Sequence, residues 1–169
     1  MRSANTTAKS RMAPRRRPAA VANVPDEPGA KREIRLTLFE KAIDRLLSEP
    51  ENGDFVIFEL RDSADSYVQY MLHDTAILGE VSSRGWIAEG ELPDNERVTA
   101  LGCLGFEGGG LRANFARDHL PHDARRLACL TELLFGAAYR PATDFDITVV
   151  TKSLIEAEAA KRRRQEVDA

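Results

Sequence analysis

The sequence predicts an α+β domain with an antiparallel sheet, and two features carry that prediction. First, three short segments of alternating apolar residues follow one another between residues 54 and 83, separated by short polar breaks. Side chains alternate across a strand and such breaks allow only hairpins, so these segments predict a three-strand antiparallel meander. Second, apolar residues recur at helical spacing on both sides of this stretch, which predicts helices that cover the sheet. The expected order is α-β-β-β-α-β-α-β, with about five strands.

Length and charge predict one folded domain between a basic arm and a polar tail. A chain of 169 residues with 43% hydrophobic content can bury one sizeable core. Residues 1–32 carry eight Lys/Arg against two Asp/Glu and almost no large apolar side chain, so we expect a disordered arm. Residues 33–152, with 12 Lys/Arg against 21 Asp/Glu, form the expected α+β domain, and residues 153–169 a polar helix or tail. The acidic domain should repel nucleic acid, so any such binding is expected through the arm.

The cysteines and the hydropathy predict a cytoplasmic protein. Cys103 and Cys129 lie far apart in apolar helical patterns without a secretory framework, so we expect two reduced, buried thiols. No apolar run approaches the roughly 18–20 residues of a membrane span. The Arg-rich N-terminus also lacks the apolar region of a signal peptide.

The first predicted element is an amphipathic helix from Ile34 to Glu49, which Pro50 and the pair Asn52-Gly53 end. Its apolar residues share one helical face. They are Leu36, Phe39, Ile43, Leu46 and Leu47.

The two faces of the predicted meander differ in composition. The core face is wholly apolar and consists of Val56, Phe58, Leu60, Val68, Tyr70 and Leu72. The opposite face mixes Phe55, Ile57, Tyr67 and Met71 with Glu59 and Gln69. Burying an unpaired carboxylate is costly, and so is exposing a large apolar patch. We therefore predict an interface with a partner or a second copy, with cover by the chain's own ends as the alternative.

The predicted elements after the meander are two helices and two strands. A helix begins near Pro93, with Asp94 and Glu96 in its first turn, and ends at Gly105. A glycine turn at 108–110 then leads into a fourth strand, Leu111–Phe115.

The next helix begins at Pro121 and Asp123, and its wide apolar face can cover a sheet. That face consists of Ala124, Leu127, Ala128, Thr131, Leu134, Phe135 and Ala138. Phe145–Thr151 alternates as a fifth strand, and a short polar helix follows from Leu154 to Glu166.

No motif predicts catalysis, a metal or a cofactor. His119 and His122 lie close to Asp118 and Asp123, but Pro121 breaks regular ligand spacing and no second ligand cluster exists. The glycine turn lacks the lysine of a phosphate-binding loop. Cys103 has no nearby histidine with an orienting group.

Several aromatic and glycine positions carry a family resemblance between about residues 34 and 151. They are Gly53-Asp54-Phe55-Val56, Tyr67-Val68-Gln69-Tyr70, Glu80-Val81-Ser82, Leu101, Leu104-Gly105-Phe106 and Asn114-Phe115. With the element order, they make the chain resemble the TY-Chap and YbjN-like domains of bacteria, especially actinobacteria. Phe106 and Phe115 stand where the pattern has tryptophan. The resemblance implies a type III secretion chaperone-like fold that binds other polypeptides, often as a dimer, and implies no catalytic residues.

The expected function is therefore non-enzymatic protein binding, chaperone-like, on the mixed sheet face. The expected partner-binding residues are Phe55, Ile57, Tyr67, Gln69, Met71 and Trp86. Trp86 is either an anchor at the rim of the interface or a plug of the core. The alternative function is a nucleic-acid- or ribosome-associated factor that acts through Arg15, Arg16 and Arg17, although a short basic run is more often a solvated tail.

Overall fold

The computed structural model describes residues 28–48, 54–83, 94–109, 114–153, 155–156 and 159–160. Within them the elements follow the order α1 (Pro28–Ser48), β1 (Phe55–Leu60), β2 (Ser63–His73), β3 (Ala76–Val81), α2 (Asn95–Cys103), β4 (Glu107–Gly108), β5 (Phe115–Arg117), α3 (Ala124–Ala138) and β6 (Ile147–Thr151). None of the described helices is both long and apolar enough to span a membrane.

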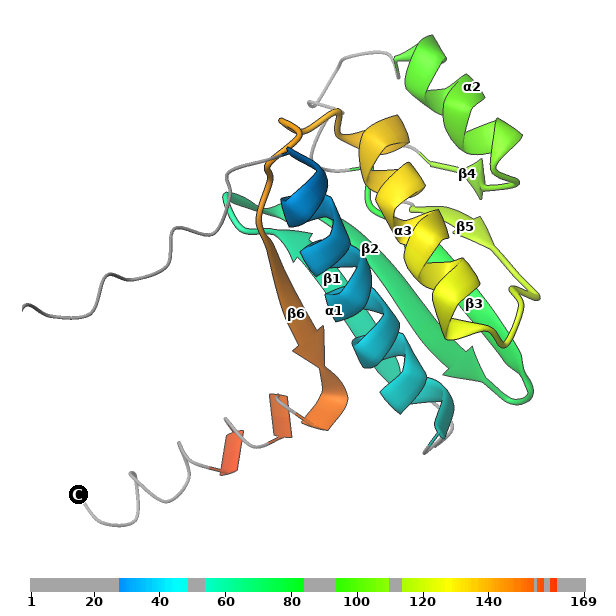
Figure 1. Cartoon of the computed structure of the whole chain (residues 1–169). Coiled ribbons are helices and arrows are strands. Elements are labelled where there is room, and N and C mark those ends of the chain that lie inside the picture. Colours follow the sequence, from blue (N-terminus) through cyan, green and yellow to red (C-terminus); the bar gives the residue numbers. More distant parts are fainter. Residues whose placement is uncertain are drawn as a thin grey trace, which may run out of the picture.

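The strands form one six-stranded antiparallel sheet in the order β4-β5-β3-β2-β1-β6. The predicted meander of β1, β2 and β3 is confirmed and occupies the centre of the sheet. α1 and α3 lie side by side across one face, and α2 packs beside α3 (Figure 1). The result is a two-layer α+β architecture.

The core lies between the sheet and the helices, on the face predicted from the alternation. Val56 and Phe58 of β1 are fully buried, as are Val68 and Tyr70 of β2, whereas Leu60 at the end of its strand is only half-buried. Aromatic rings join the layers: Phe39 of α1 lies 4.8 Å from Phe58 and 6.0 Å from Phe135 of α3, measured between ring centroids. The core face of the meander was therefore predicted correctly apart from Leu60.

The helix boundaries show where local signals suffice. Asp94 accepts hydrogen bonds from the backbone of Glu96 and Arg97, and Asp123 accepts one from Arg126, so both predicted acidic caps begin their helices. α1 instead begins at Pro28, six residues before the predicted Ile34. The helix thus takes in the last five residues that composition assigned to the arm. Proline is favoured at the first position of a helix, which fits this start, and Lys31 in the first turn pairs with Asp144 at 3.4 Å.

The glycine-rich region differs from its prediction. The fourth predicted strand, Leu111–Phe115, shares only Phe115 with β5, and residues 110–113 lie outside the described residues. The two-residue strand β4, which alternation could not reveal, precedes it. Gly108 and Gly109 have φ angles of 94° and 83°. A Cβ atom at Gly109 would collide with the ring of Phe115, so the close approach of β4 to β5 requires glycine there.

The prediction of two buried thiols is wrong for both cysteines. Both cysteines are free thiols, but Cys103 is exposed at the end of α2 and Cys129 is half-buried in α3. α2 buries only Leu101 fully, and Gly102 and Cys103 at its end face solvent.

Candidate protein-binding face of the sheet

The sheet face that points away from α1 and α3, here called the outer face, has an unusual composition for a surface. Its side chains are half-buried, except for the exposed Thr148 and Glu107. They are Phe55, Ile57 and Glu59 of β1; Tyr67, Gln69 and Met71 of β2; Ala76, Leu78 and Glu80 of β3; Ala116 of β5; Thr148 and Val150 of β6; and Glu107 of β4. The period-two alternation of the strands separates this set from the buried core set.

The strand register brings five of the six predicted partner-binding residues together. Phe55 stands opposite Met71, and Ile57 stands opposite Gln69. Tyr67 stands opposite Glu59. The sixth residue, Trp86, lies outside the described residues, as do Arg15, Arg16 and Arg17 of the alternative site.

One transverse row shows how the face changes across the sheet. The row runs Val150, Ile57, Gln69, Glu80, Ala116, Glu107, and so crosses all six strands. It is apolar at the β6 end and acidic at the β4 end. The neighbouring row, Phe55, Met71 and Leu78, is wholly apolar.

Two hydrogen bonds order polar groups on this face. Gln69 Nε2 donates to Glu80 Oε2 at 3.4 Å, and Asn114 Nδ2 donates to Tyr67 Oη at 3.1 Å. The first holds a carboxylate in place beside the apolar rows, and the second fixes the orientation of an aromatic ring.

The charge of the outer face is negative. Glu59, Glu80 and Glu107 all point to it, whereas Arg117, the one Lys or Arg within the described strands, shares the opposite face with Phe115. Arg117 Nη1 donates to the carbonyl oxygen of Leu104 at 2.7 Å on that helical side. The outer face therefore combines a continuous apolar area with three carboxylates, while His73 at the end of β2 and Lys152 just after β6 lie at its border.

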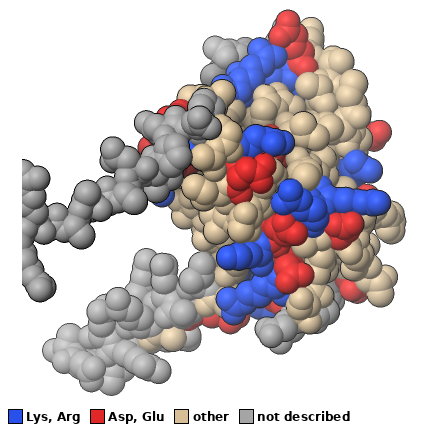
Figure 2. Space-filling view, in the orientation of Figure 1, with Lys and Arg blue, Asp and Glu red and all other residues tan. Residues whose placement is uncertain are grey.

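The opposite, helical surface looks like ordinary solvated protein. Figure 2 shows Lys and Arg side chains next to Asp and Glu side chains over this surface. Arg125 of α3, for example, pairs with Glu40 of α1 at 2.9 Å. Charges of both signs interspersed in this way are typical of helix surfaces that face water.

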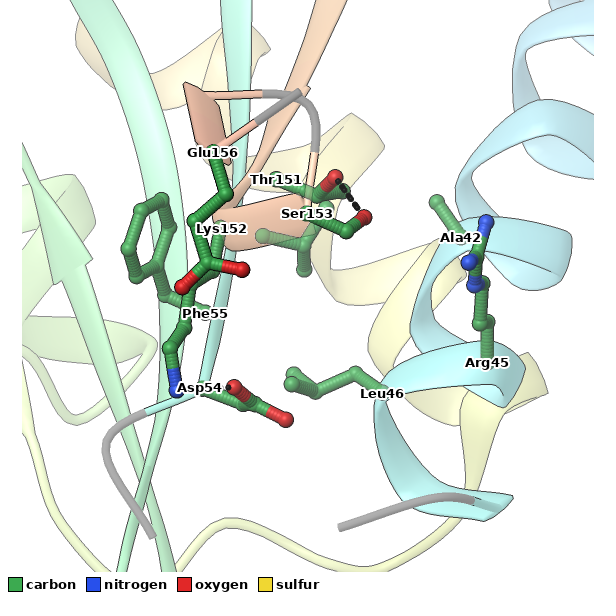
Figure 3. A pocket seen from close by; sticks show the side chains of 10 residues that line it. Ala42, Arg45, Leu46, Asp54, Phe55, Thr151, Lys152, Ser153 and Glu156 are labelled. Carbon is green, nitrogen blue, oxygen red and sulfur yellow. Dashed lines mark hydrogen bonds and ion pairs between the residues drawn. The ribbon is translucent and has the colours of Figure 1, made fainter. Parts of the chain in front are cut away.

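A pocket of about 260 Å³ opens between α1 and the adjoining ends of β1 and β6 (Figure 3). Lys152 pairs with Asp54 at 3.0 Å, and the hydroxyls of Thr151 and Ser153 lie 3.0 Å apart. The charged residues of its lining, Arg45, Asp54, Lys152 and Glu156, balance to zero. Phe55 is also part of the lining, so the pocket borders the outer face.

A second pocket of about 380 Å³ surrounds Arg35 and Phe145. Arg35 is buried, and its guanidinium already donates to Glu132 and to the carbonyl oxygens of Thr143 and Phe145. The guanidinium of Arg35 thus links α1 to α3 and to the segment before β6, which is a structural role.

The buried Tyr70 and the half-buried Tyr139 have raised pKa values, and both side chains serve the structure. Burial raises the pKa of Tyr70, whose hydroxyl lies 3.0 Å from that of Thr131. Burial likewise raises the pKa of Tyr139, whose hydroxyl contacts the carbonyl oxygens of Tyr67 at 2.7 Å and Ser82 at 2.8 Å. Both phenols stay protonated at neutral pH and act as neutral hydrogen-bonding groups between α3, or the residue that follows it, and the sheet.

The histidine pair does not converge on a metal-binding geometry. Both histidines are exposed, His119 adopts a φ angle of 56°, and His122 Nε2 lies 3.1 Å from the carbonyl oxygen of Thr75. Over the described ranges, no group of three His, Cys, Asp or Glu side chains could hold a metal ion.

Sequence reasoning missed part of the outer face. Leu78 and Glu80 alternate with Ile77 and Val81, so the parity of the third strand could have placed them. Val150 and Glu107 could not be placed, because their positions depend on which strands lie next to β1 and β5.

Comparisons of the chain with family models, with curated proteins and with solved structures found no match.

Proposed function

We propose that this chain is a non-enzymatic protein-binding module that holds a segment of a partner polypeptide against the outer face of its sheet. The observation that carries the proposal is the half-buried apolar area across the strands, formed by Phe55, Ile57, Met71, Leu78 and Val150. Contiguous apolar surface of this kind is typical of interaction sites. The carboxylates at its margin fit an interface that has an apolar centre and a polar rim.

The charge of the face favours one chemistry of partner. Glu59, Glu80 and Glu107 would attract a segment that presents Lys or Arg beside apolar side chains, and would orient it during association. The same carboxylates oppose the phosphates of a nucleic acid on this face. The expected client is therefore a cationic, partly apolar polypeptide segment.

The resemblance to TY-Chap and YbjN-like domains supports polypeptide binding from a separate direction. A type III secretion chaperone-like fold would place a helix before the three-strand meander and further helices after it, and the described order is compatible with that arrangement. We propose that the α+β architecture of this chain is this fold, and that the protein has a chaperone-like role in the cytoplasm.

Capture by the full-length tagged chain tests the proposal. The variant Tyr67→Ser/Met71→Ser removes two apolar side chains from the outer face. The matched control, Leu38→Ser/Leu133→Ser, removes two exposed leucines from α1 and α3. We expect a protein that the wild type and the control both capture, and that the outer-face variant loses. Unchanged capture by the outer-face variant would contradict the proposal. If its melting temperature also fell strongly, the outer face would be part of the core and not an interface.

Charge reversal tests the chemistry of the client. Glu59→Lys/Glu80→Lys should weaken capture more than Glu33→Lys/Asp44→Lys, which reverses two exposed charges of α1, and added salt should weaken wild-type capture. An equal effect of both double variants would argue against a cationic client.

The basic arm carries the second candidate function. If nuclease treatment removes the captured material and Arg15→Ala/Arg16→Ala/Arg17→Ala abolishes capture, nucleic acid binding through the arm is the better account.

A further inference from the structure

The outward edge of β6 differs from an ordinary protected sheet edge. Among the described strands, β6 stands at one end of the order and pairs with β1 alone. The amide of Arg61 donates to the carbonyl oxygen of Asp146 at 3.1 Å, one step beyond the pair Leu60 and Ile147. Hydrogen-bonded and non-hydrogen-bonded pairs alternate along an antiparallel ladder. The backbone groups of Ile147 and Val149 therefore point away from β1, toward the outer edge.

The sequence of β6 favours strand pairing at that edge. Proteins usually protect an edge strand with lysine, proline, a bulge or very short length. β4, at the opposite end of the sheet, is two residues long. β6 has five residues, Ile-Thr-Val-Val-Thr, all β-branched, uncharged and in unbroken register with β1.

We propose that β6 pairs antiparallel with β6 of a second copy of this chain, centred on Val149. In such a pairing, residues whose backbone groups point to the outer edge must lie opposite residues of the same kind. The register centred on Val149 meets this condition and pairs all five positions of both strands. It places Ile147 opposite Thr151 of the second copy and Thr148 opposite Val150 of the second copy. Because the pairing is two-fold symmetric, each contact occurs twice.

The flanking charges select this occupant over a foreign strand. The same register places Asp146 opposite Lys152 of the second copy, and the reverse pair follows by symmetry. Asp146 and Lys152 directly flank β6, one at each end, so antiparallel pairing of two copies brings their opposite charges close together. Opposite charges that face each other across a strand pair stabilise it. The joined sheet would also bring the outer faces of both copies into one continuous surface, although the pairing does not depend on any function of that surface.

A charge swap separates the intermolecular pair from the pairs within one chain. Asp146 already pairs with Arg61 at 3.1 Å, and Lys152 already pairs with Asp54 at 3.0 Å. Asp146→Lys and Lys152→Asp each disturb both kinds of pair. The double variant restores opposite charges only between the two copies, because Arg61 and Asp54 are unchanged.

Analytical ultracentrifugation of the full-length chain over a concentration series measures the dissociation constant of the dimer. We expect a wild-type dimer, a dissociation constant raised about tenfold in each single variant, and recovery to within about threefold in the double variant. A wild-type chain that stays monomeric overturns the proposal, as does a double variant that dimerises no better than the single ones.

Amide hydrogen exchange of the unmodified chain is a second, independent test. The amide of Val149 should exchange slowly where the dimer forms and quickly after dilution, whereas Val150, bonded to β1, should be protected in both conditions. A Val149 amide that stays unprotected in a dimer overturns the assignment of the edge. Tyr67→Ser/Met71→Ser should leave the dimer intact, so failure of the outer-face proposal and failure of this one are distinguishable.

Discussion

Arg35 of α1 donates two hydrogen bonds to Glu132 of α3, from Nε to Oε2 at 3.1 Å and from Nη2 to Oε1. Its Nη1 donates to the carbonyl oxygens of Thr143 at 3.3 Å and Phe145 at 3.2 Å, and the guanidinium lies 3.8 Å from the centroid of the Phe145 ring. The Arg35 side chain is only 6% exposed. One buried cation thus joins both covering helices to the segment that leads into β6.

Removing one partner of this pair should cost more than removing both. Glu132→Leu leaves the buried guanidinium without its carboxylate and should lower the free energy of unfolding by about 3 kcal/mol. Arg35→Met/Glu132→Leu leaves no orphaned charge, so its loss should be well below the sum of the losses of Glu132→Leu and Arg35→Met. Urea unfolding of the four proteins measures the coupling, and strictly additive losses would argue against it.

Phe58 is the strongest test of the core face. Its ring is fully buried, 4.8 Å from Phe39 and 6.4 Å from Tyr70 between centroids. Phe58→Ala should lower the free energy of unfolding by about 3–5 kcal/mol. The half-buried Leu60, on the same strand and face, supplies the control, because Leu60→Ala should cost clearly less. Equal losses in denaturant unfolding would mean that Phe58 is not at the centre of the core.

Two glycines should respond to alanine with opposite signs. A Cβ atom at Gly79 would lie 2.5 Å from Cδ1 of Leu120 and 3.2 Å from Cζ of Phe106, both in the core. Gly79→Ala should therefore destabilise by about 1–3 kcal/mol through overpacking. Gly136 in α3 has no atom within 4 Å of such a Cβ, so Gly136→Ala should stabilise by about 0.5–1 kcal/mol. Thermal unfolding compares both, and a tolerated alanine at position 79 would contradict the close packing of β3 under Leu120.

Alkaline pH should destabilise the fold through the phenols of the buried Tyr70 and the half-buried Tyr139. Burial raises the pKa of Tyr70 and of Tyr139 above the ordinary value of 10.0. Below pH 10 both states keep the protons, so the stability is fully present. Above pH 10 the unfolded phenols ionise while the folded ones do not, and the free energy of unfolding falls by about 1.4 kcal/mol per pH unit for each tyrosine.

Unfolding in urea between pH 9 and 11.5 measures that slope. Tyr70→Phe should reduce the slope of the free energy of unfolding against pH by the contribution of one tyrosine. Tyr70→Phe/Tyr139→Phe should reduce it by the contributions of both. Identical slopes in the wild type and the double variant would show that these phenols ionise equally in both states.

Deleting residues 1–27 should leave the melting temperature nearly unchanged. This segment contains almost no large apolar side chain, and α1 begins after it at Pro28. Deletion through residue 32 should lower the melting temperature, because it also removes Lys31 and Arg32, which pair with Asp144 and Glu132. Equal melting temperatures for the two truncations would show that the first turn of α1 adds no stability.

The meander and the division of its two faces were predictable because both depend on neighbours in the chain. Alternation fixes the parity of side chains within a strand, and breaks as short as His73-Asp74 leave hairpins as the only connection. The helix caps Asp94 and Asp123 were equally predictable from the sequence, since a capping side chain binds backbone amides within three residues of itself. These local rules were enough to place Phe55, Ile57, Tyr67, Gln69 and Met71 on one face.

By itself, then, the sequence determined the α+β class, the central meander, the two helices with acidic caps and the composition of the outer face. Only the tertiary structure decided that β6 lies beside β1, that β4 exists, that α1 reaches back to Pro28 and that Arg35 is a buried cation. Arg35 and Glu132 are 97 residues apart, and β6 follows β1 by almost as many. Periodicity reports which side of an element is apolar, but it carries no information about which distant element covers that side, because that choice depends on packing between segments that share no local pattern.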